Sequence, residues 1–270
     1  MPRKQAATQS ILELPHLQGP FHIIGDVHGC FRELVSLLEE LHYKVAFDEQ
    51  KQQYHITRPD SSIVLFVGDL VDRGPNSPEV VRLVMNMVDA GLAYCVSGNH
   101  DDKLFRMLSG RSVKIRHGLE ITVAQLKKYD SSFRQKIKNF LGSLPHHIIL
   151  DHGRLVVAHA GLEEELHGLN TKGVRELCLY GPTTGEIDDK GLPVRLDWAA
   201  EYCGNAIVVY GHTPVHEPLW RNNTINIDTG CVFGGRLTAL TYPDHLVHSV
   251  DALETYAQSI RPFIRYHHHH

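Results

Sequence analysis

The stretch FHIIGDVHGC, residues 21–30, places an aspartate and a histidine directly behind a short apolar run. Asp26 and His28 are flanked by glycines, which permit the tight turns that ligand loops use. Apolar residues then recur at helical spacing, at Phe31, Leu34, Val35, Leu37, Leu38 and Leu41. The pattern predicts a buried strand over 21–24, a ligand loop and then a helix.

The same arrangement occurs at four further places in the chain. In each, a polar cluster containing glycine follows an apolar run; the clusters are Gly68-Asp69-Leu70-Val71-Asp72-Arg73-Gly74, Gly98-Asn99-His100-Asp101, His159-Ala160-Gly161 and Gly211-His212-Thr213. Five such clusters are hard to assign to chance or to ordinary core histidines. We therefore expect them to meet at one edge of a buried sheet.

The order of the predicted elements indicates the fold class. Strand, loop and helix alternate at the start, helical spacing replaces this pattern over 103–145, and short strands follow in quick succession. We expect an α/β (α+β) protein, an αββα sandwich of two mixed sheets flanked by helices. Residues 1–266 would form a single domain with a helical insertion at 103–145. The residues before Phe21 are predicted to be loose, and Gly181–Val194 to be a long loop near the site.

Composition excludes several classes of protein. The chain has 270 residues, 42% of them hydrophobic, and no apolar run of membrane-spanning length. Residues 1–14 lack the pattern of a signal peptide, so a soluble cytoplasmic protein is expected. The five cysteines have no Cys-x-x-Cys pair, and we interpret them as free, mostly buried thiols. His267–His270 are interpreted as part of a purification tag.

Charge is distributed unevenly along the chain. The net charge is −4, but Lys103–Lys138 carries ten Lys or Arg against two acids, a balance of +8 that leaves −12 elsewhere. This segment would place a basic wall beside the metal site, where it attracts polyanions. The alternative interpretation is that this segment forms a pair of amphipathic helices whose charged faces are solvated.

The residue types in the clusters suit a pair of divalent cations. Two cations about 3.5–4 Å apart lower the pKa of an attacking water and neutralise charge on the attacking and leaving oxygens of a phosphate ester. Imidazole with carboxylate favours Mn, Fe, Zn or Ni over Mg alone, and Mn is our first choice. The expected metal ligands are Asp26 and His28 on one ion, Asp69 as the bridge, and Asn99, His159 and His212 on the other.

Three further residues suit catalysis rather than metal binding. His100 follows Asn99 and would protonate the leaving oxygen as a general acid. Asp72 would orient that imidazole, and Arg73 offers a planar pair of donors to phosphate oxygens. His100 and Asn99 would also contact the substrate.

With these residues the chain resembles calcineurin-like metallophosphoesterases of the phosphoprotein-phosphatase type. Within that group it is most similar to the phosphatase module of bacterial polynucleotide kinase-phosphatases, and next to bacterial dinucleoside tetraphosphatases. The closer likeness comes from four segments, Leu179-Tyr180-Gly181 with Thr184-Gly185, Pro193-Val194-Arg195, Tyr210–Val215 and Ile227–Gly235.

The resemblance implies the same metal ligands and the same roles for Arg73 and His100. It adds Asp228 as a residue needed for activity from outside the ligand set. Two departures stand out: Asp101 occupies a position where many family members have Glu, and no kinase or ligase module accompanies the phosphatase.

Three functions follow from these observations. The first is a Mn-dependent phosphoesterase acting on nucleotide or nucleic-acid terminal (2′/3′) phosphates, with an RNA or DNA end as partner and no membrane. The second keeps the chemistry but takes dinucleoside tetraphosphates or serine/threonine phosphoproteins. The third is a catalytically inactive metal-binding scaffold, which predicts the loss of His100, Arg73 or a bridging carboxylate; none of these is missing.

Overall fold

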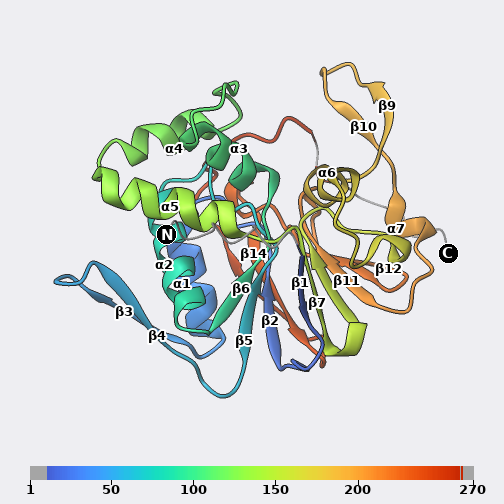
Figure 1. Ribbon diagram of the computed structural model, residues 1–270, viewed down its shortest axis with the longest axis horizontal. Coiled ribbons are helices and arrows are strands. Elements are labelled where there is room, and N and C mark those ends of the chain that lie inside the picture. Colours follow the sequence, from blue (N-terminus) through green and yellow to red (C-terminus); the bar gives the residue numbers. More distant parts are fainter. Residues whose placement is uncertain (1–10, 262, 264–270) are drawn as a thin grey trace, which may run out of the picture.

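Two mixed sheets packed face to face form the centre of the molecule (Figure 1). The computed structural model describes residues 11–261 and Phe263, so the expected tag at 267–270 lies outside the described residues. Along one sheet the strand order is β15-β14-β2-β5-β6, and along the other it is β1-β7-β8-β11-β13-β12. Two-stranded hairpins, β3-β4 and β9-β10, project from this body.

The strands are β1 (Ile11–Leu14), β2 (Phe21–Ile24), β3 (Lys44–Asp48), β4 (Gln53–Thr57), β5 (Ile63–Phe66), β6 (Ala93–Cys95), β7 (His147–Leu150), β8 (Leu155–Ala158), β9 (Thr183–Ile187), β10 (Pro193–Arg195), β11 (Ile207–Tyr210), β12 (Leu219–Arg221), β13 (Thr224–Asn226), β14 (Arg236–Tyr242) and β15 (Val247–Asp251). The α-helices are α1 (Phe31–Glu40), α2 (Ser77–Asp89), α3 (Asn99–Leu108), α4 (Leu119–Leu126), α5 (Ser131–Ser143), α6 (Lys172–Tyr180) and α7 (Trp198–Glu201).

The core is layered as an αββα sandwich, which confirms the predicted fold class. One apolar cluster lies between the two sheets and includes Ile23, Leu65, Val157 and Val209, all fully buried. A larger cluster joins the outer face of the β2 sheet to helices α1 to α5. Helices α6 and α7 lie beside the other sheet (Figure 1).

Parallel pairing brings the ligand loops to one edge. β2 pairs in parallel with β5, and β5 with β6, while β8 pairs in parallel with β11. The carboxyl ends of parallel strands meet at the same side of a sheet, so the clusters that follow these strands converge. The predicted strand at 21–24 has the expected bounds.

Two parts of the prediction were wrong. The segment Gly181–Val194 contains the antiparallel hairpin β9-β10 rather than a loop, and the loose N-terminus contains β1. All five residues of β9 are exposed, so no alternation of apolar residues marks the strand. β1 pairs with β7, a partner distant in sequence that a four-residue pattern does not reveal.

The predicted helical insertion at 103–145 contains all of α4 and α5 and the part of α3 that follows its first four residues. Among the described residues, the cysteines are free, and four of the five are buried, as expected. No helix in the described part of the chain has the length and apolar character that a membrane crossing needs.

Candidate metal centre

The loop between β2 and α1 presents the first two predicted ligands. Asp26 and His28 are both buried, at 3% and 4% exposure. The His28 Nδ1–H donates to the Val71 carbonyl at 2.8 Å, because a carbonyl can only accept. The tautomer is thereby fixed, and Nε2 keeps its lone pair for a ligand.

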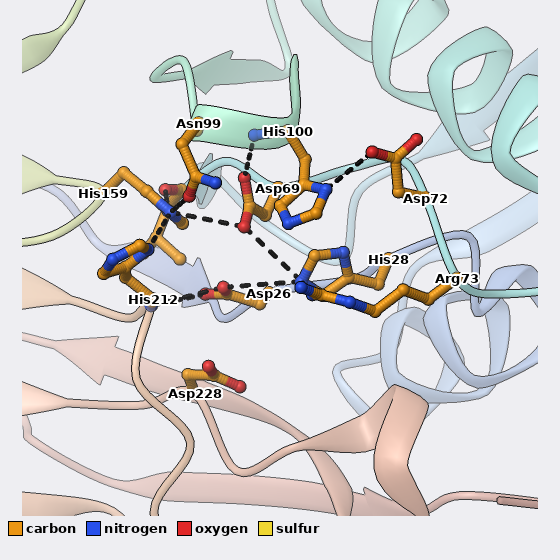
Figure 2. A network of polar contacts seen from close by, with 12 residues as sticks. Asp26, His28, Asp69, Asp72, Arg73, Asn99, His100, His159, His212 and Asp228 are labelled. Atoms are coloured by element: carbon orange, nitrogen blue, oxygen red, sulfur yellow. Dashed lines mark hydrogen bonds and ion pairs between the residues drawn. The ribbon is translucent and has the colours of Figure 1, made fainter. Parts of the chain in front are cut away.

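Asp69 lies at the centre of the site (Figure 2). Its Oδ1 accepts the backbone N–H of His100 at 2.9 Å. Its Oδ2 lies 3.4 Å from Nε2 of His28 and 3.3 Å from Nε2 of His159. One carboxylate oxygen therefore faces a histidine from each sheet, as a bridging ligand must.

The second group of ligands comes mainly from the other sheet. His159 follows β8, His212 follows β11, and Asn99 begins α3. Nε2 of His159 lies 3.0 Å from Oδ1 of Asn99 and 3.1 Å from Nδ1 of His212. These atoms, with Oδ2 of Asp69, converge on one point.

The donor set fits divalent cations. Ligand atoms of Asp69, His159 and His212 lie within 4.8 Å of one another, and so do those of His28, Asp69 and His100. Nε2 of His212 is buried with no hydrogen-bond partner among the described residues. The nitrogen of His212 that faces the other donor atoms is Nδ1, and two imidazole nitrogens 3.1 Å apart beside a carboxylate oxygen suit a shared cation.

The grouping of His28, Asp69 and His100 differs in membership from the prediction. It contains His100 rather than Asp26, whose Oδ2 lies 4.0 Å from Nε2 of His28. Nδ1 of His100 is already engaged by Asp72 at 2.6 Å. We keep Asp26 in the expected ligand set, because among the described residues its buried carboxylate accepts only the His212 backbone N–H, at 3.2 Å.

Burial and mutual repulsion set the protonation of the ligands. Burial, followed by the charge of Asp228, holds the pKa of Asp26 well above its usual range. Burial, followed by nearby arginines, holds the pKa values of His28 and His212 well below normal. Both imidazoles are therefore neutral and able to bind metal.

The pKa values of the remaining two titratable ligands, Asp69 and His159, are shifted by each other's charge against the effect of burial. Although burial opposes the charged form, the carboxylates of Asp69 and Asp26 raise the pKa of His159 to about 9. Burial likewise opposes the ionised form of Asp69, yet His159 and His100 hold its pKa well below normal. In the metal-free protein His159 therefore carries a proton, and a bound cation would replace the positive charge of that proton.

Strained backbone marks the site. Five of its residues have left-handed φ values: His28 (44°), Asp69 (49°), Asp72 (76°), Arg73 (69°) and His212 (72°). Each such conformation costs about 1–2 kcal/mol for a residue with a Cβ, and it clusters where function requires it. Gly98 and Gly211 are also required, because a Cβ at either position would collide with the carboxylate of Asp69 or Asp26.

Two arginines face the metal ligands. Arg73 donates from Nη1 to Nε2 of His28 at 2.8 Å, and its guanidinium lies 5.3 Å from the centre of the Phe233 ring. Arg73 also lines a cavity into which expected ligands open. Arg195 on β10 lines the same cavity and donates to the Thr213 hydroxyl. Burial, followed by the charge of Arg261, lowers the pKa of Arg195 to about 10.

Arg195 was absent from the predicted site. It directly follows Gly181–Val194, the segment that we expected to be a loop. The Pro193-Val194-Arg195 motif was visible in the sequence, but only the β9-β10 hairpin directs this side chain toward the cavity.

His100 and Asp72 form a buried pair, as predicted. Oδ2 of Asp72 accepts from Nδ1 of His100 at 2.6 Å, and its Oδ1 accepts the Thr122 hydroxyl at 2.7 Å. Asp101 has a different role, since its oxygens accept the backbone N–H groups of Leu70 and Gly98 at 3.0 and 2.9 Å. It fixes the loop that carries Asp69.

Asp228 lies beside the ligands rather than among them (Figure 2). Its Oδ1 accepts the Gly230 backbone N–H at 3.0 Å. Burial raises the pKa of its carboxyl to about 6. The carboxylate lines the cavity and acts on Asp26 through its charge, which agrees with a place outside the ligand set.

The sequence matches the model of the calcineurin-like phosphoesterase family over residues 19–216. The chain belongs to the calcineurin-like phosphoesterase family. Members of this family are metal-dependent hydrolases that use divalent cations, and this chain is therefore a metal-dependent phosphoesterase.

Several relatives are similar over nearly the whole chain. The chain is 46% identical over 248 residues to the asymmetrical bis(5′-nucleosyl)-tetraphosphatase PrpE of Anoxybacillus flavithermus, covering 90% of this chain and 99% of the relative. The protein of the same name from Geobacillus thermodenitrificans is 47% identical over 232 residues, 84% of this chain and 92% of its own.

Solved structures agree with the fold. A crystal structure of a protein assigned as a diadenosine tetraphosphatase superimposes with a TM-score of 0.64 at 28% identity, covering 90% of this chain and 98% of that one. The structure of a serine/threonine phosphatase from Saccharomyces cerevisiae superimposes with a TM-score of 0.60 at 16% identity, covering 92% of this chain and 84% of that one. The second likeness supports the fold alone.

Proposed function

We propose that the six converging side chains hold two divalent cations and that the protein hydrolyses dinucleoside tetraphosphates there. Asp26 and His28 would hold one ion, Asn99, His159 and His212 the other, with Asp69 shared. The observation that carries this proposal is Oδ2 of Asp69, which lies 3.4 and 3.3 Å from histidines of the two sheets. When bound, the cations lower the pKa of the attacking water and neutralise phosphate charge.

The chain's own residues then complete the reaction. Arg73 and Arg195 bind the non-bridging oxygens of the scissile phosphate and hold it for attack along the line of the breaking bond. His100 donates a proton to the leaving oxygen as the phosphorus–oxygen bond breaks. Asp72 holds His100 in the required tautomer through the 2.6 Å contact at Nδ1.

Manganese remains our preferred metal, because the ligands combine neutral imidazoles with carboxylates and an amide oxygen. Nickel, iron and zinc suit the same donors. A single domain over 1–266 and a cytoplasmic location also remain predictions.

The relatives change the order of the predicted substrates. The two reported above are named as asymmetrical tetraphosphatases, and this chain covers more than nine-tenths of each. We therefore place dinucleoside tetraphosphates ahead of the nucleic-acid terminal phosphates that sequence analysis placed first. A polynucleotide kinase-phosphatase likeness receives no support from the comparisons. An asymmetrical cut of a dinucleoside tetraphosphate yields a nucleoside monophosphate and a nucleoside triphosphate.

The cavity above the ligands suits a polyanionic substrate. It has a volume of about 850 Å³, and its lining includes Arg73, Arg195 and four cations from residues 103–116. The single phosphate group of a phosphoprotein would need only Arg73 and Arg195. A chain of four phosphates would use the remaining positive charge.

A substrate panel tests this proposal. Specificity constants would be measured with Mn²⁺ for diadenosine tetraphosphate, a 3′-phosphorylated oligonucleotide and a phosphoserine peptide, and Asp69→Asn would serve as the inactive control. We expect diadenosine tetraphosphate to lead by at least about tenfold, with AMP and ATP as products. A lead for either other substrate, or ADP as the only product, would overturn the assignment.

A further inference from the structure

One rim of the site cavity carries positive charge that the proposed chemistry does not use. It consists of Lys103 and Arg106 on α3 and of Lys114 and Arg116 on the loop from α3 to α4 (residues 109–118). We call these four residues the basic rim. The loop projects beyond the helices on the side of the molecule where the β9-β10 hairpin also projects (Figure 1).

The basic rim begins at the predicted general acid. His100, Lys103 and Arg106 follow one another at intervals of three residues on α3, so they lie along one face of the helix. Each interval advances about 4.5 Å along the axis. Lys103 Nζ donates to the Arg116 carbonyl at 2.9 Å, which fixes the loop against the helix.

The charges of the basic rim differ in whether they are neutralised. Nε of Arg106 pairs with Asp102 at 2.8 Å. Lys114 and Arg116 are exposed, and no carboxylate among residues 11–261 and 263 forms an ion pair with either. Burial, together with the charges of Arg116 and Arg106, lowers the pKa of Lys103, although Asp72 and Glu120 oppose this.

The facing wall is different. There Asp188, at the tip of the β9-β10 hairpin, accepts from Arg261 Nε at 3.1 Å and from its Nη2 at 2.5 Å. Positive charge on that wall is neutralised within the protein, except at Arg195. Positive charge without a carboxylate partner among the described residues thus extends from Lys103 on α3 to Lys114 and Arg116 on the loop that follows.

We propose that Lys103, Lys114 and Arg116 form a subsite for the phosphates of the leaving nucleoside triphosphate. The inference rests on the proposed function, because it assigns a direction to that reaction. A water oxygen forms the new bond to the phosphorus next to one nucleoside, and the bond from this phosphorus to the bridging oxygen breaks. His100 gives its proton to that oxygen. The three remaining phosphates then lie beside Lys103 and the loop.

The subsite would also explain a preference for long phosphate chains. An aryl phosphate carries no charge beyond the leaving oxygen, whereas a triphosphate leaving group carries several charges to these cations. Single exposed charge pairs contribute little, but several cations that line one cavity attract a polyanion together.

The test compares two double variants that remove equal charge. Lys114→Ala/Arg116→Ala removes the exposed members of the subsite. Lys128→Ala/Lys136→Ala removes two cations from the same segment of sequence, but these line a different cavity, between α2, α5 and the β3-β4 hairpin. We expect the first variant to lose about 10–30-fold in kcat/KM for diadenosine tetraphosphate, mainly through KM, and the second to match the wild type.

Two readouts keep the inference separate from the proposed function. With p-nitrophenyl phosphate both variants should stay within about twofold of the wild type, since this ester lacks the distal phosphates. ATP, added at constant free Mn²⁺, should inhibit aryl phosphate hydrolysis, and its inhibition constant should rise at least about fivefold in Lys114→Ala/Arg116→Ala alone.

An unchanged inhibition constant for ATP, or an equal loss with both substrates, would overturn the subsite. Failure of the wild type to cleave diadenosine tetraphosphate, with aryl phosphatase activity retained, would instead overturn the proposed function. The ATP measurement still decides the subsite in that case.

Discussion

Two cavities of similar volume differ in what their polar groups do. The cavity above the metal ligands measures about 850 Å³, and the cavity between α2, α5 and the β3-β4 hairpin measures about 720 Å³. In the first, His212 Nε2 has no partner among the described residues, and carboxylates crowd together. In the second, the most buried charge, Arg82, is paired with a carboxylate and bonded to a backbone carbonyl of the protein.

Arg82 shows how the second cavity is completed by its own residues. Its Nε donates to Glu79 at 3.2 Å, its Nη1 donates to the Gln52 carbonyl at 2.8 Å, and its guanidinium lies 3.9 Å from the centre of the Phe133 ring. Such an arrangement joins the hairpin, α2 and α5. Cavity volume therefore does not identify a site here, whereas unsatisfied, converging ligand atoms do.

Removing a ligand from the first cavity should have the largest effect. His212→Ala deletes the imidazole whose Nδ1 lies 3.1 Å from Nε2 of His159, and we expect kcat for p-nitrophenyl phosphate with Mn²⁺ to fall by about 10³-fold or more. His216→Ala is the matched control, because His216 is exposed and packs on Phe263 with ring centres 5.1 Å apart. Retained activity in His212→Ala would remove the distinction between the two cavities.

Removing the orienting carboxylate should have the next largest effect. Asp72→Asn keeps the shape but loses the charge that holds His100, so kcat should fall by about 10²–10⁴-fold while KM stays within about twofold. Thr122→Val, which removes only the hydroxyl bound to Oδ1 of Asp72, should lose much less. Equal losses in steady-state assays of the two variants would contradict the orienting role.

Substitution in the second cavity should lower stability and leave catalysis intact. Arg82→Met keeps the apolar contact with Phe133 but breaks the partly buried pair with Glu79, and we expect the free energy of unfolding to fall by about 2–3 kcal/mol. Urea unfolding followed by circular dichroism measures this change. A drop in kcat beyond about twofold would show that the second cavity takes part in the reaction.

The smallest effect should come from a buried histidine outside both cavities. Burial lowers the pKa of His147 to about 4, and its Nε2 accepts the Gly168 backbone N–H at 3.0 Å. Because the unfolded chain binds this proton with a pKa of about 6.5, the stability that neutral His147 contributes is complete above pH 6.5. It is lost as the pH falls toward 4.

His147→Gln isolates this contribution. Urea unfolding of the metal-free wild type and variant at pH 7.5 and pH 5 would give the difference in stability at each pH. We expect that difference to move in favour of the variant by about 2 kcal/mol at pH 5. A difference independent of pH would show that His147 titrates normally in the folded protein.

The ligand loops could be predicted because their signal is local. Asp26, Asp69 and His212 each follow a short apolar run and stand beside a glycine, and these glycines allow the close approach seen in the structure. Strand, loop and helix follow in order, so parallel pairing brings the loops together. The two-sheet sandwich follows from the same alternation and from the later run of strands.

The remainder depends on contacts that sequence patterns do not contain. Arg195 reaches the cavity because an exposed hairpin directs it there, and the left-handed backbone at Asp72 and Arg73 follows from packing rather than residue type. The +8 segment was open to two interpretations, and both hold in part. Lys114 and Arg116 line the site cavity, whereas its other end, with Lys128 and Lys136, lines the second cavity.

The central claim is that Asp69 joins two cation sites, and counting bound metal tests it most directly. Equilibrium dialysis against Mn²⁺, followed by elemental analysis, would give the number of ions per chain for the wild type, Asp69→Asn and the control Arg82→Met. We predict two ions per chain for the wild type and the control, and fewer than one for Asp69→Asn. A wild type that binds a single ion at saturation, or an Asp69→Asn variant that keeps both, would contradict the account.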